Sequence, residues 1–335
     1  MKDRIRVAIN GFGRIGRITL RRLLTNPQVD VVAINDLADA KTLAHLLKYD
    51  SIHRGLLAEI SAESNNLHID NLVIPCFALK EPKMLPWKDL AVDIVIESTG
   101  KFLSSELANE HLMAGARRVL LSAPPADKNI PTVVLGVNDH EIDWSAKIIS
   151  NASCTTNNVA PMVKILDELG GIEDGYITTV HSYTSDQNLH DAPHRDLRRA
   201  RAAAVSMIPT STGAAKAITS IFPHLTGKLG GAGIRVPVPN GSLTDFTCIL
   251  KKQVTVAQIN EAFLRASQNS LKGILQYTAD PIVSIDIQEN IHSCVFDSEL
   301  TSIVGSLVKV VGWYDNEWGY SSRIADVVEH IRLID

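Results

Sequence analysis

Apolar and polar positions alternate along the first part of the chain in a pattern that predicts strands and helices in turn. Residues 4–10 and 29–35 are short apolar runs typical of buried strands. Between them, an apolar repeat through Ile15, Ile18 and Leu23 predicts a helix that ends before Pro27. Further strands are expected at 67–69, 72–77, 92–97 and 118–122, and further helices after Asp39 and Leu103. This alternation indicates an α/β domain with a doubly wound, mostly parallel sheet.

The pattern changes in the second half of the chain, where strands outnumber helices. Strands are expected at 176–181, 233–237, 243–252 and 308–314, and Thr255 with Gln258 forms a capping box ahead of one helix. We therefore expect the doubly wound α/β domain over 1–152 and an α+β domain with a mainly antiparallel sheet over 153–318. A closing amphipathic helix, 319–335, is expected to pack back on the first domain; its apolar stripe is Ile324, Val327, Val328 and Ile331.

Composition narrows the class of protein. A length of 335 residues suggests two domains, and the net charge of −4 gives no general attraction to nucleic acid or anionic membranes. Residues 1–6 lead directly into a strand, so no signal peptide is expected, and no apolar run reaches the length of a membrane span. The cysteines are far apart, which argues against a zinc site or a disulfide framework and fits a cytoplasmic protein: Cys76, Cys154, Cys248 and Cys294.

A glycine-rich segment, Gly11-Phe12-Gly13-Arg14-Ile15-Gly16, follows the first strand and opens the first helix. Glycines there allow a tight turn and the close approach of a pyrophosphate to a helix N-terminus. Asp36 ends the second strand, where a carboxylate suits the ribose hydroxyls of an adenosine. The order strand, glycines, helix, strand and acid predicts a Rossmann-type dinucleotide site. Thr99 and Ser122 also follow strands, and are equally consistent with cofactor contacts and with ordinary turn roles.

Cys154 is the residue with the clearest chemical potential. It lies among small hydroxyl and amide residues, just before an apolar stripe that predicts a helix ending near Gly170. Such a polar turn is a poor core, so we interpret Cys154 as a nucleophile rather than as a buried structural cysteine. The exposed amides and the dipole at a helix N-terminus are expected to lower a thiol pKa there.

His181 is the candidate partner of this cysteine. It ends a predicted strand and precedes a polar turn, and a Cys–His pair is a common means of activating a thiol. Chemistry alone leaves a structural role for His181 equally open. The basic run 194–201 is interrupted by Asp196 and Leu197, which favours discrete phosphate recognition over binding of nucleic acid.

Five segments together resemble the phosphorylating glyceraldehyde-3-phosphate dehydrogenases. They lie in order along essentially the whole chain: 9–17 (INGFGRIGR), 46–51 (LLKYDS), 150–157 (SNASCTTN), 193–202 (PHRDLRRARA) and 313–320 (WYDNEWGY). The resemblance implies NAD-dependent oxidation of glyceraldehyde 3-phosphate with inorganic phosphate as the second substrate. The reaction passes through a thiohemiacetal and a thioester on Cys154, and His181 acts as base and acid.

The resemblance also assigns further residues. Asn316 corresponds to the residue that holds the nicotinamide carboxamide, and Lys80 lies at an adenine-side contact. Ser153 and Thr155 flank the nucleophile and are grouped with the residues that match the two phosphate sites of the family: Thr184, Arg199, Thr212, Gly213 and Arg235. A homotetramer is usual in this family, with the 182–208 loop across a subunit interface.

Two local departures from the family pattern occur away from the expected chemistry. Arg54 separates His53 from Gly55, which can alter a loop, and Lys80-Glu81 replaces a common Arg-Asp pair. Asp36 and Pro193 both favour NAD over NADP, because a carboxylate repels a 2′-phosphate and the NADP-using relatives tend to carry a small polar residue in place of the proline.

Two alternatives remain at this point. One is an erythrose-4-phosphate dehydrogenase, a related activity with the same nucleophile motif; those enzymes usually depart from the Tyr-Thr-x-Asp-Gln pattern that is intact here at 183–187. The other is a nucleotide-binding protein with a regulatory or RNA-contacting role through the 194–201 run. The presence of both Cys154 and His181 argues against the second alternative.

Overall fold

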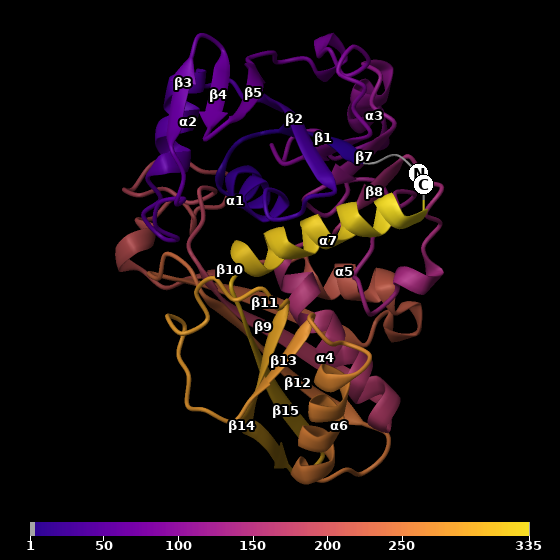
Figure 1. Cartoon of the computed structure of the whole chain (residues 1–335). Helices are drawn as coiled ribbons and strands as arrows, with labels where there is room; N and C mark the ends of the chain where they lie inside the picture. Colours follow the sequence, from indigo (N-terminus) through magenta and orange to yellow (C-terminus); the bar gives the residue numbers. More distant parts are fainter. Residues whose placement is uncertain (1–3, 335) are drawn as a thin grey trace. The chain divides into compact units, whose positions relative to one another are not determined.

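The fold is described from a computed structural model, over residues 4–334 (Figure 1). Residues 1–3, expected to lead into the first strand, and Asp335, the expected end of the last helix, lie outside the described part. The chain divides into two compact units. The first comprises the chain up to Val133, Glu141–Ala152 and the residues from Ser321 on, and the second comprises Val134–His140 and Ser153–Tyr320.

The first unit is built on an eight-stranded sheet. Parallel pairing links six adjacent strands, while β3 and β4 extend one edge by antiparallel pairing, so the predicted mostly parallel sheet is confirmed. The strand order is β3 (Ile60–Glu63), β4 (Asn66–Ile69), β5 (Leu72–Phe77), β2 (Val29–Asn35), β1 (Ile5–Asn10), β6 (Ile94–Glu97), β7 (Arg118–Leu121) and β8 (Ile148–Ser150). The sequence patterns missed β3 and β8, which are short.

The topology of this sheet defines where a ligand binds. From β1 the chain moves first to β2 and later to β6 on the other side, so the direction of winding reverses between β1 and β6. Ligands of such sheets bind at this switch point, beyond the carboxyl ends of the strands. The helices of the unit are α1 (Arg14–Leu23), α2 (Ala40–Lys48), α3 (Ser105–Met113) and, from Ser321 on, α7 (Trp318–Ile334).

Local signals set the helix ends of the first unit. Asp39 caps α2 by accepting a hydrogen bond from Thr42 N at 2.7 Å, as expected from the sequence. Ser104 caps α3 in the same way, and Gly115, with φ +104°, follows this helix. The expected apolar stripe of α7 is buried at Ile324, Val327, Val328 and Ile331.

The second unit has a seven-stranded, mainly antiparallel sheet, as predicted. Its order is β10 (Ile208–Thr210), β11 (Leu229–Val236), β9 (Ile172–Ser182), β12 (Ser242–Leu250), β15 (Leu307–Tyr314), β14 (Cys294–Val304) and β13 (Leu275–Thr278). Only β11–β9 and β14–β13 pair in parallel. The helices α4 (Cys154–Gly170), α5 (Ala214–Ile221) and α6 (Val256–Gln268) pack on this sheet, and α4 also contacts both other helices (Figure 1).

Packing between α4, α6 and the sheet forms the core of the second unit. Val159, Met162, Val163 and Leu166 of α4 are fully buried, and Phe263 of α6 stacks on Phe296 of β14 at 3.8 Å between ring centroids. The capping box of Thr255 and Gln258 is present at the start of α6. The chain also contains short 3-10 turns at Pro82–Met84, Asp139–Glu141, Ala203–Val205 and Pro223–Leu225. Over residues 4–334, no helix is both long and apolar enough to cross a membrane.

Candidate active site

Cys154 is the first residue of α4, so the prediction of a cysteine at a helix N-terminus is confirmed. Ser153 is the N-cap residue, and its hydroxyl accepts a hydrogen bond from Thr156 N at 3.1 Å and lies 2.8 Å from Thr156 Oγ1. This capping role occupies much of the hydrogen-bonding capacity of Ser153. The thiol is half-buried and lies beside the backbone amide of Thr155.

His181 and Arg235 reach the same point from two neighbouring strands. His181 Nε2 lies 3.5 Å from Cys154 Sγ, although the two residues are 27 positions apart in sequence. Strands β9 and β11 pair in parallel with His181 opposite Arg235, which places a guanidinium next to the imidazole. Arg235 Nη1 lies within hydrogen-bond distance of His181 Nδ1 and donates to Ser182 O at 2.9 Å.

The imidazole nitrogen Nδ1 therefore has two competing neighbours. Ser182 O lies 2.7 Å from Nδ1 and requires a proton on that nitrogen, whereas an arginine nitrogen can only donate and requires Nδ1 without one. In the first tautomer, Nε2 presents a lone pair to the thiol of Cys154. In the second, Nε2 carries the proton and cannot accept another. Arg235 therefore controls whether His181 can act as a base.

Burial determines the protonation of the pair. It raises the pKa of Cys154, while Arg235 and the hydrogen bonds from Thr155 act in the opposite direction. Burial and the adjacent Arg235 cation lower the pKa of His181 to about 3. The amides at the helix N-terminus act to lower the thiol pKa, as expected, but desolvation of the thiolate outweighs them, so the expected net lowering is wrong for this structure. The structure favours a neutral thiol beside a neutral imidazole.

Tyr314 is a buried neighbour that sequence reasoning did not assign to the site. Its hydroxyl lies 2.9 Å from Thr155 Oγ1 and 2.9 Å from Thr179 Oγ1. Its ring packs edge-on against the His181 ring, with 5.9 Å between the ring centroids. It thereby joins α4, β9 and β15 directly behind the Cys154–His181 pair. The 313–320 segment was recognised as distinctive, but only the pairing of strands shows that Tyr314 reaches this position.

Asn316 follows β15 and its amide has a defined orientation. Its Oδ1 accepts hydrogen bonds from Ser182 Oγ and Ser242 Oγ, each at 2.9 Å, and Ser182 N in turn donates to Ser242 Oγ at 3.1 Å. With the oxygen held by two hydroxyls, the amide presents its Nδ2 donor for other interactions. This polarity suits the carbonyl oxygen of a carboxamide.

The residues expected to bind phosphate lie in two places. Arg235 is part of the pair described above. Arg199 Nε donates to Thr210 Oγ1 at 2.9 Å, and its guanidinium also forms ion pairs with Asp186 and Asp196. Burial lowers the pKa of Arg235, and the charges of Arg199 and Asp186 also act on it, in opposite directions.

Three further residues of this group lie on loops or helix ends. Thr212 Oγ1 accepts from Ala214 N at 3.2 Å, and Gly213 immediately precedes α5. A side chain added at Gly213 would meet no described atom within 4 Å, so the backbone there is open to a ligand. Thr184 is half-buried in the loop after β9 and donates its N–H to Gln187 Oε1 at 3.2 Å.

The glycine-rich turn of the first unit fits a bound dinucleotide. A Cβ at Gly16 would lie 2.1 Å from Gly11 O, and Gly11 itself has φ +93°, so both positions require glycine. At Gly13, by contrast, a Cβ would meet no described atom within 4 Å. The turn is therefore closed toward the protein and open toward a ligand. Phe12 of this turn is buried and anchors it in the core, and Ile15 is half-buried.

The remaining cofactor candidates surround this turn. Asp36 Oδ2 accepts a hydrogen bond from Phe12 N at 2.7 Å, so the carboxylate is tied to the glycine-rich turn. Thr99 and Ser122 follow β6 and β7, and Lys80 is exposed after β5. Arg14 forms an ion pair with Asp50 at 2.6 Å; burial opposes a charged Asp50, but hydrogen bonds from His53, Arg14 and Ile52 lower its pKa to about 2.

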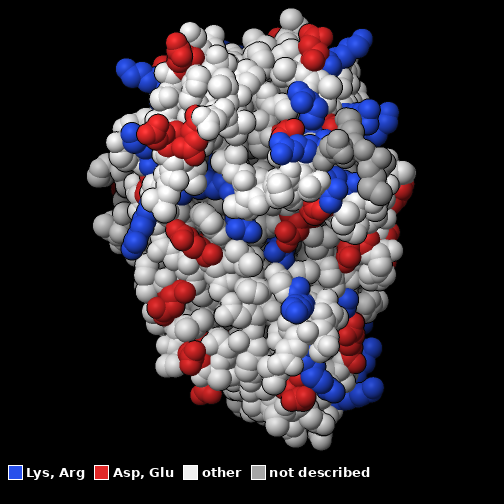
Figure 2. Space-filling view, viewed as in Figure 1, with Lys and Arg blue, Asp and Glu red and all other residues white. Residues whose placement is uncertain are grey.

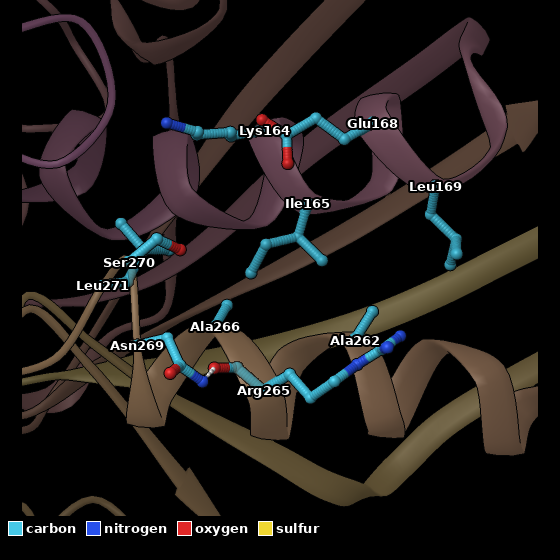
Figure 3. Close-up of a pocket in the computed structure, with 10 residues that line it drawn as sticks. All are labelled: Lys164, Ile165, Glu168, Leu169, Ala262, Arg265, Ala266, Asn269, Ser270 and Leu271. Carbon is cyan, nitrogen blue, oxygen red and sulfur yellow. Dashed lines mark hydrogen bonds between the residues drawn. The ribbon is translucent and has the colours of Figure 1, made fainter.

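A groove between α4 and α6 is separate from these residues. It encloses about 340 Å³, and Figure 3 shows Ile165 and Ala266 facing each other across it, with Lys164 and Arg265 at its margins. Lys164 lies ten positions beyond Cys154, about 15 Å along the helix. The groove therefore has no direct part in chemistry at Cys154.

Comparison with known proteins agrees with this geometry. The family model of the glyceraldehyde 3-phosphate dehydrogenase NAD binding domain matches residues 5–105, and that of the C-terminal domain matches residues 153–316. Curated relatives include glyceraldehyde-3-phosphate dehydrogenases from Mycobacterium avium, 54% identical over 97% of both chains, and Geobacillus stearothermophilus, 52% identical over 98% of both. Glyceraldehyde-3-phosphate dehydrogenase 2 of Bacillus subtilis is 50% identical over 98% of this chain and 97% of its own. With an NAD-binding Rossmann domain followed by this mainly antiparallel domain, the chain belongs to the glyceraldehyde 3-phosphate dehydrogenase family.

Proposed function

We propose that this chain carries out the reaction of its family, the NAD-dependent oxidative phosphorylation of glyceraldehyde 3-phosphate to 1,3-bisphosphoglycerate, with Cys154 as the nucleophile. This is a step of glycolysis and, in reverse, of gluconeogenesis. The observation that carries the assignment is the thiol at the start of α4 with His181 Nε2 at 3.5 Å. Geometry of this kind serves nucleophilic attack assisted by a base.

In the first step, Cys154 attacks the aldehyde carbon while its proton moves to His181 Nε2. Because burial disfavours the separated charges, this transfer accompanies attack rather than preceding it. His181 returns this proton to the carbonyl oxygen, so the product is a neutral thiohemiacetal on Cys154. Bound NAD would supply the hydride acceptor; as the thiohemiacetal carbon is oxidised, His181 takes the hydroxyl proton, and a thioester remains on the cysteine. When inorganic phosphate cleaves the thioester, His181 returns that proton to the cysteine sulfur, which restores the thiol and releases the acyl phosphate, and the proton of the attacking phosphate passes to solvent.

Arg235 links substrate binding to this proton transfer. Its Nη1 faces His181 Nδ1 and favours the tautomer whose Nε2 cannot accept a proton. A substrate phosphate that engages the guanidinium weakens this contact, and Nδ1 then donates to Ser182 O at 2.7 Å. Nε2 is left with a lone pair facing Cys154. Phosphate binding thus prepares the base when the aldehyde is in place.

The cofactor contacts are assigned to the carboxyl edge of the first sheet and to Asn316. The open backbone at Gly13 suits the pyrophosphate, and Asp36 suits the ribose hydroxyls. Asn316 Nδ2 is oriented to donate to the carboxamide oxygen of the nicotinamide, which fixes the ring face that receives hydride. Arg199, Thr212, Gly213 and Thr184 are assigned to the two phosphate groups.

Two statements about the whole protein follow from family membership. We propose that the chain forms a homotetramer and acts in the cytoplasm, with glyceraldehyde 3-phosphate and inorganic phosphate as its partners in the reaction. Nucleic acid is not proposed as a primary partner. In the 194–201 region, Arg199 and Arg201 pair with Asp186, Asp191 and Asp196, and Figure 2 shows basic and acidic side chains interspersed on the viewed face.

An assay of NAD reduction with glyceraldehyde 3-phosphate, with and without inorganic phosphate, tests the proposal. Sustained turnover that requires phosphate is the expected result. Faster turnover with erythrose 4-phosphate, independent of phosphate, would instead identify the four-carbon alternative. Binding of NAD with no turnover of either aldehyde would support the regulatory alternative and overturn the proposal.

A further inference from the structure

Glu97 is a fully buried carboxylate at the carboxyl end of β6, and four hydrogen-bond donors surround it. Thr99 N donates to Oε1 at 2.7 Å, and Thr99 Oγ1 donates to the same oxygen. Asn10 Nδ2 and His111 Nε2 lie within hydrogen-bond distance of Oε2. A carboxylate, which only accepts, satisfies all four donors at once.

Trp87 fixes the form of His111. The indole Nε1 can only donate, and it lies 3.0 Å from His111 Nδ1, so Nδ1 is the acceptor and the ring proton is on Nε2. His111 therefore donates to Glu97 as a neutral imidazole. Within residues 4–334, no lysine or arginine forms an ion pair with Glu97, and the carboxylate is held by dipolar donors alone.

Asn10 and Asn35 extend this network across the sheet. Glu97, Asn10 and Asn35 are the last residues of β6, β1 and β2, and the strand register places Asn10 directly beside the other two. Asn35 Nδ2 donates to Asn10 Oδ1 at 2.7 Å and to Leu79 O at 3.0 Å, while Leu79 N donates to Asn35 Oδ1 at 2.9 Å. A buried row of hydrogen-bonded side chains therefore connects the loops that follow β1, β2, β5 and β6.

These four loops are the ones that carry the proposed cofactor contacts. Asn10 precedes the glycine-rich turn, Asn35 precedes Asp36, Leu79 precedes Lys80, and Glu97 bonds directly to Thr99. The glycine-rich turn also packs against the Thr99 loop, because a Cβ at Gly11 would lie 2.7 Å from Thr99 N. A change in the Glu97 carboxylate would therefore shift the parts of the site relative to one another.

We propose that Glu97 is a positioning residue for NAD, acting through Thr99 and Asn10 to hold the cofactor loops in their binding geometry. The inference rests on the loop of Thr99 belonging to the cofactor-binding edge of the first sheet, as proposed above. It does not depend on chemistry at Cys154, because its effect is on binding of the cofactor. The isosteric variant E97Q replaces an acceptor oxygen by an NH₂ group that faces donors, and leaves at least one of them without a partner.

The test measures the dissociation constant for NAD by calorimetry, in the full-length protein and in E97Q. We expect binding to weaken by about tenfold or more, about 1.4 kcal/mol, because loops that are no longer held in place must be ordered when NAD binds. The KM for inorganic phosphate should change much less than the KM for NAD. A folded E97Q protein that binds NAD as tightly as the unmodified protein would overturn the proposal.

D297N provides a matched control in the second unit. Asp297 is also a buried carboxylate; it accepts from Trp313 Nε1 at 3.0 Å and Glu299 N at 3.2 Å. This variant should lower Tm without changing the affinity for NAD. Equal losses of NAD affinity in both variants would show that E97Q acts only through general destabilisation and would contradict a positioning role.

Variants of Thr99 keep the proposal testable even if E97Q does not fold. T99S retains the hydroxyl that donates to Glu97 and T99V lacks it, so T99V should bind NAD more weakly than T99S. Equal NAD affinities for T99S and T99V would argue against coupling through this hydroxyl. If E97Q folds, its effect and that of T99V should be less than additive, because both remove the same hydrogen bond; additive effects would contradict action through Thr99.

Discussion

The cofactor edge of the first unit and the Cys154–His181 site of the second unit are built on different physical principles. The edge consists of turns at the ends of adjacent parallel strands, held by main-chain geometry and by a buried row of uncharged donors around Glu97. The reactive site brings three ionisable side chains from α4, β9 and β11 to one point, where burial and mutual charge change their protonation. The geometry of the cofactor edge suits binding of the cofactor, and that of the Cys154–His181 site suits proton transfer.

This difference predicts how substitutions act. Changes at the edge should alter affinity for NAD and leave the proton chemistry intact. Changes at the reactive site should alter rates and pH dependence while NAD continues to bind. The following substitutions test this separation, starting with the largest expected effect.

Replacing Cys154 by serine should abolish aldehyde oxidation while the affinity for NAD stays close to that of the unmodified protein. An alcohol is far less acidic than a thiol and is a poor nucleophile with the same base. Oxidation rates and NAD titrations on the same preparation provide the comparison. Substantial remaining activity would remove Cys154 from the role of nucleophile.

His181→Asn should slow hydride transfer by about 10²–10⁴-fold, the usual contribution of a positioned acid–base group. Single-turnover formation of NADH measures this effect. A rate within a few-fold of that of the unmodified enzyme would show that a group other than His181 acts as the base for Cys154. The affinity for NAD should again change little, because His181 makes none of the proposed cofactor contacts.

The same variant has a predictable effect on acid stability. The folded-state pKa of His181 is about 3, below its ordinary value of 6.5, so the unfolded chain binds one more proton than the folded protein between these values. Stability therefore falls as the pH is lowered through this window, by up to about 1.4 kcal/mol per pH unit. Urea unfolding at several pH values should show a shallower dependence in His181→Asn; identical slopes would contradict burial of a neutral imidazole.

Arg235→Leu should impair use of glyceraldehyde 3-phosphate much more than use of unphosphorylated glyceraldehyde. A guanidinium offers paired hydrogen bonds to phosphate that an alkyl group lacks. The ratio of kcat/KM for the two aldehydes is the measurement, and NAD affinity serves as the control. Equal losses with both aldehydes would show that Arg235 does not recognise the substrate phosphate.

The smallest expected effect concerns the choice of cofactor at the edge. We expect NAD to be preferred over NADP by at least about tenfold in kcat/KM, which requires only about 1.4 kcal/mol. Asp36 already accepts from Phe12 N and would repel a 2′-phosphate. Combining Asp36→Gly with Pro193→Ser should reduce the ratio of kcat/KM for NAD to kcat/KM for NADP. Similar kcat/KM values for NAD and NADP in the unmodified protein would show that another group receives the phosphate.

Local patterns in the sequence predicted much of the fold. The caps at Asp39 and Thr255 and the apolar stripe of α7 are short-range features, and the structure contains all of them. The strands β13 and β14 and the helix α5 were missed, because their apolar residues lie in short or irregular runs and their pairing is decided by distant partners.

The candidate site was predictable only where it depends on residues close together in the sequence. The position of Cys154 at a helix start is readable from its neighbours, whereas its protonation depends on burial by distant residues, and the predicted direction was wrong. Tyr314 and Glu97 were not identified because their significance depends on partners far away in sequence. For Tyr314 these are Thr155 and Thr179, and for Glu97 they include Asn10.

The most direct test of the account is to follow the acyl group on Cys154. Mixing the enzyme with NAD and glyceraldehyde 3-phosphate, without inorganic phosphate, should give a burst of NADH equal to the number of Cys154 thiols. Mass spectrometry should then find the acyl group on the peptide that contains Cys154, and adding phosphate should release it as the acyl phosphate with renewed turnover. Steady NADH production without phosphate, or an acyl group absent from Cys154 after the burst, would contradict the account.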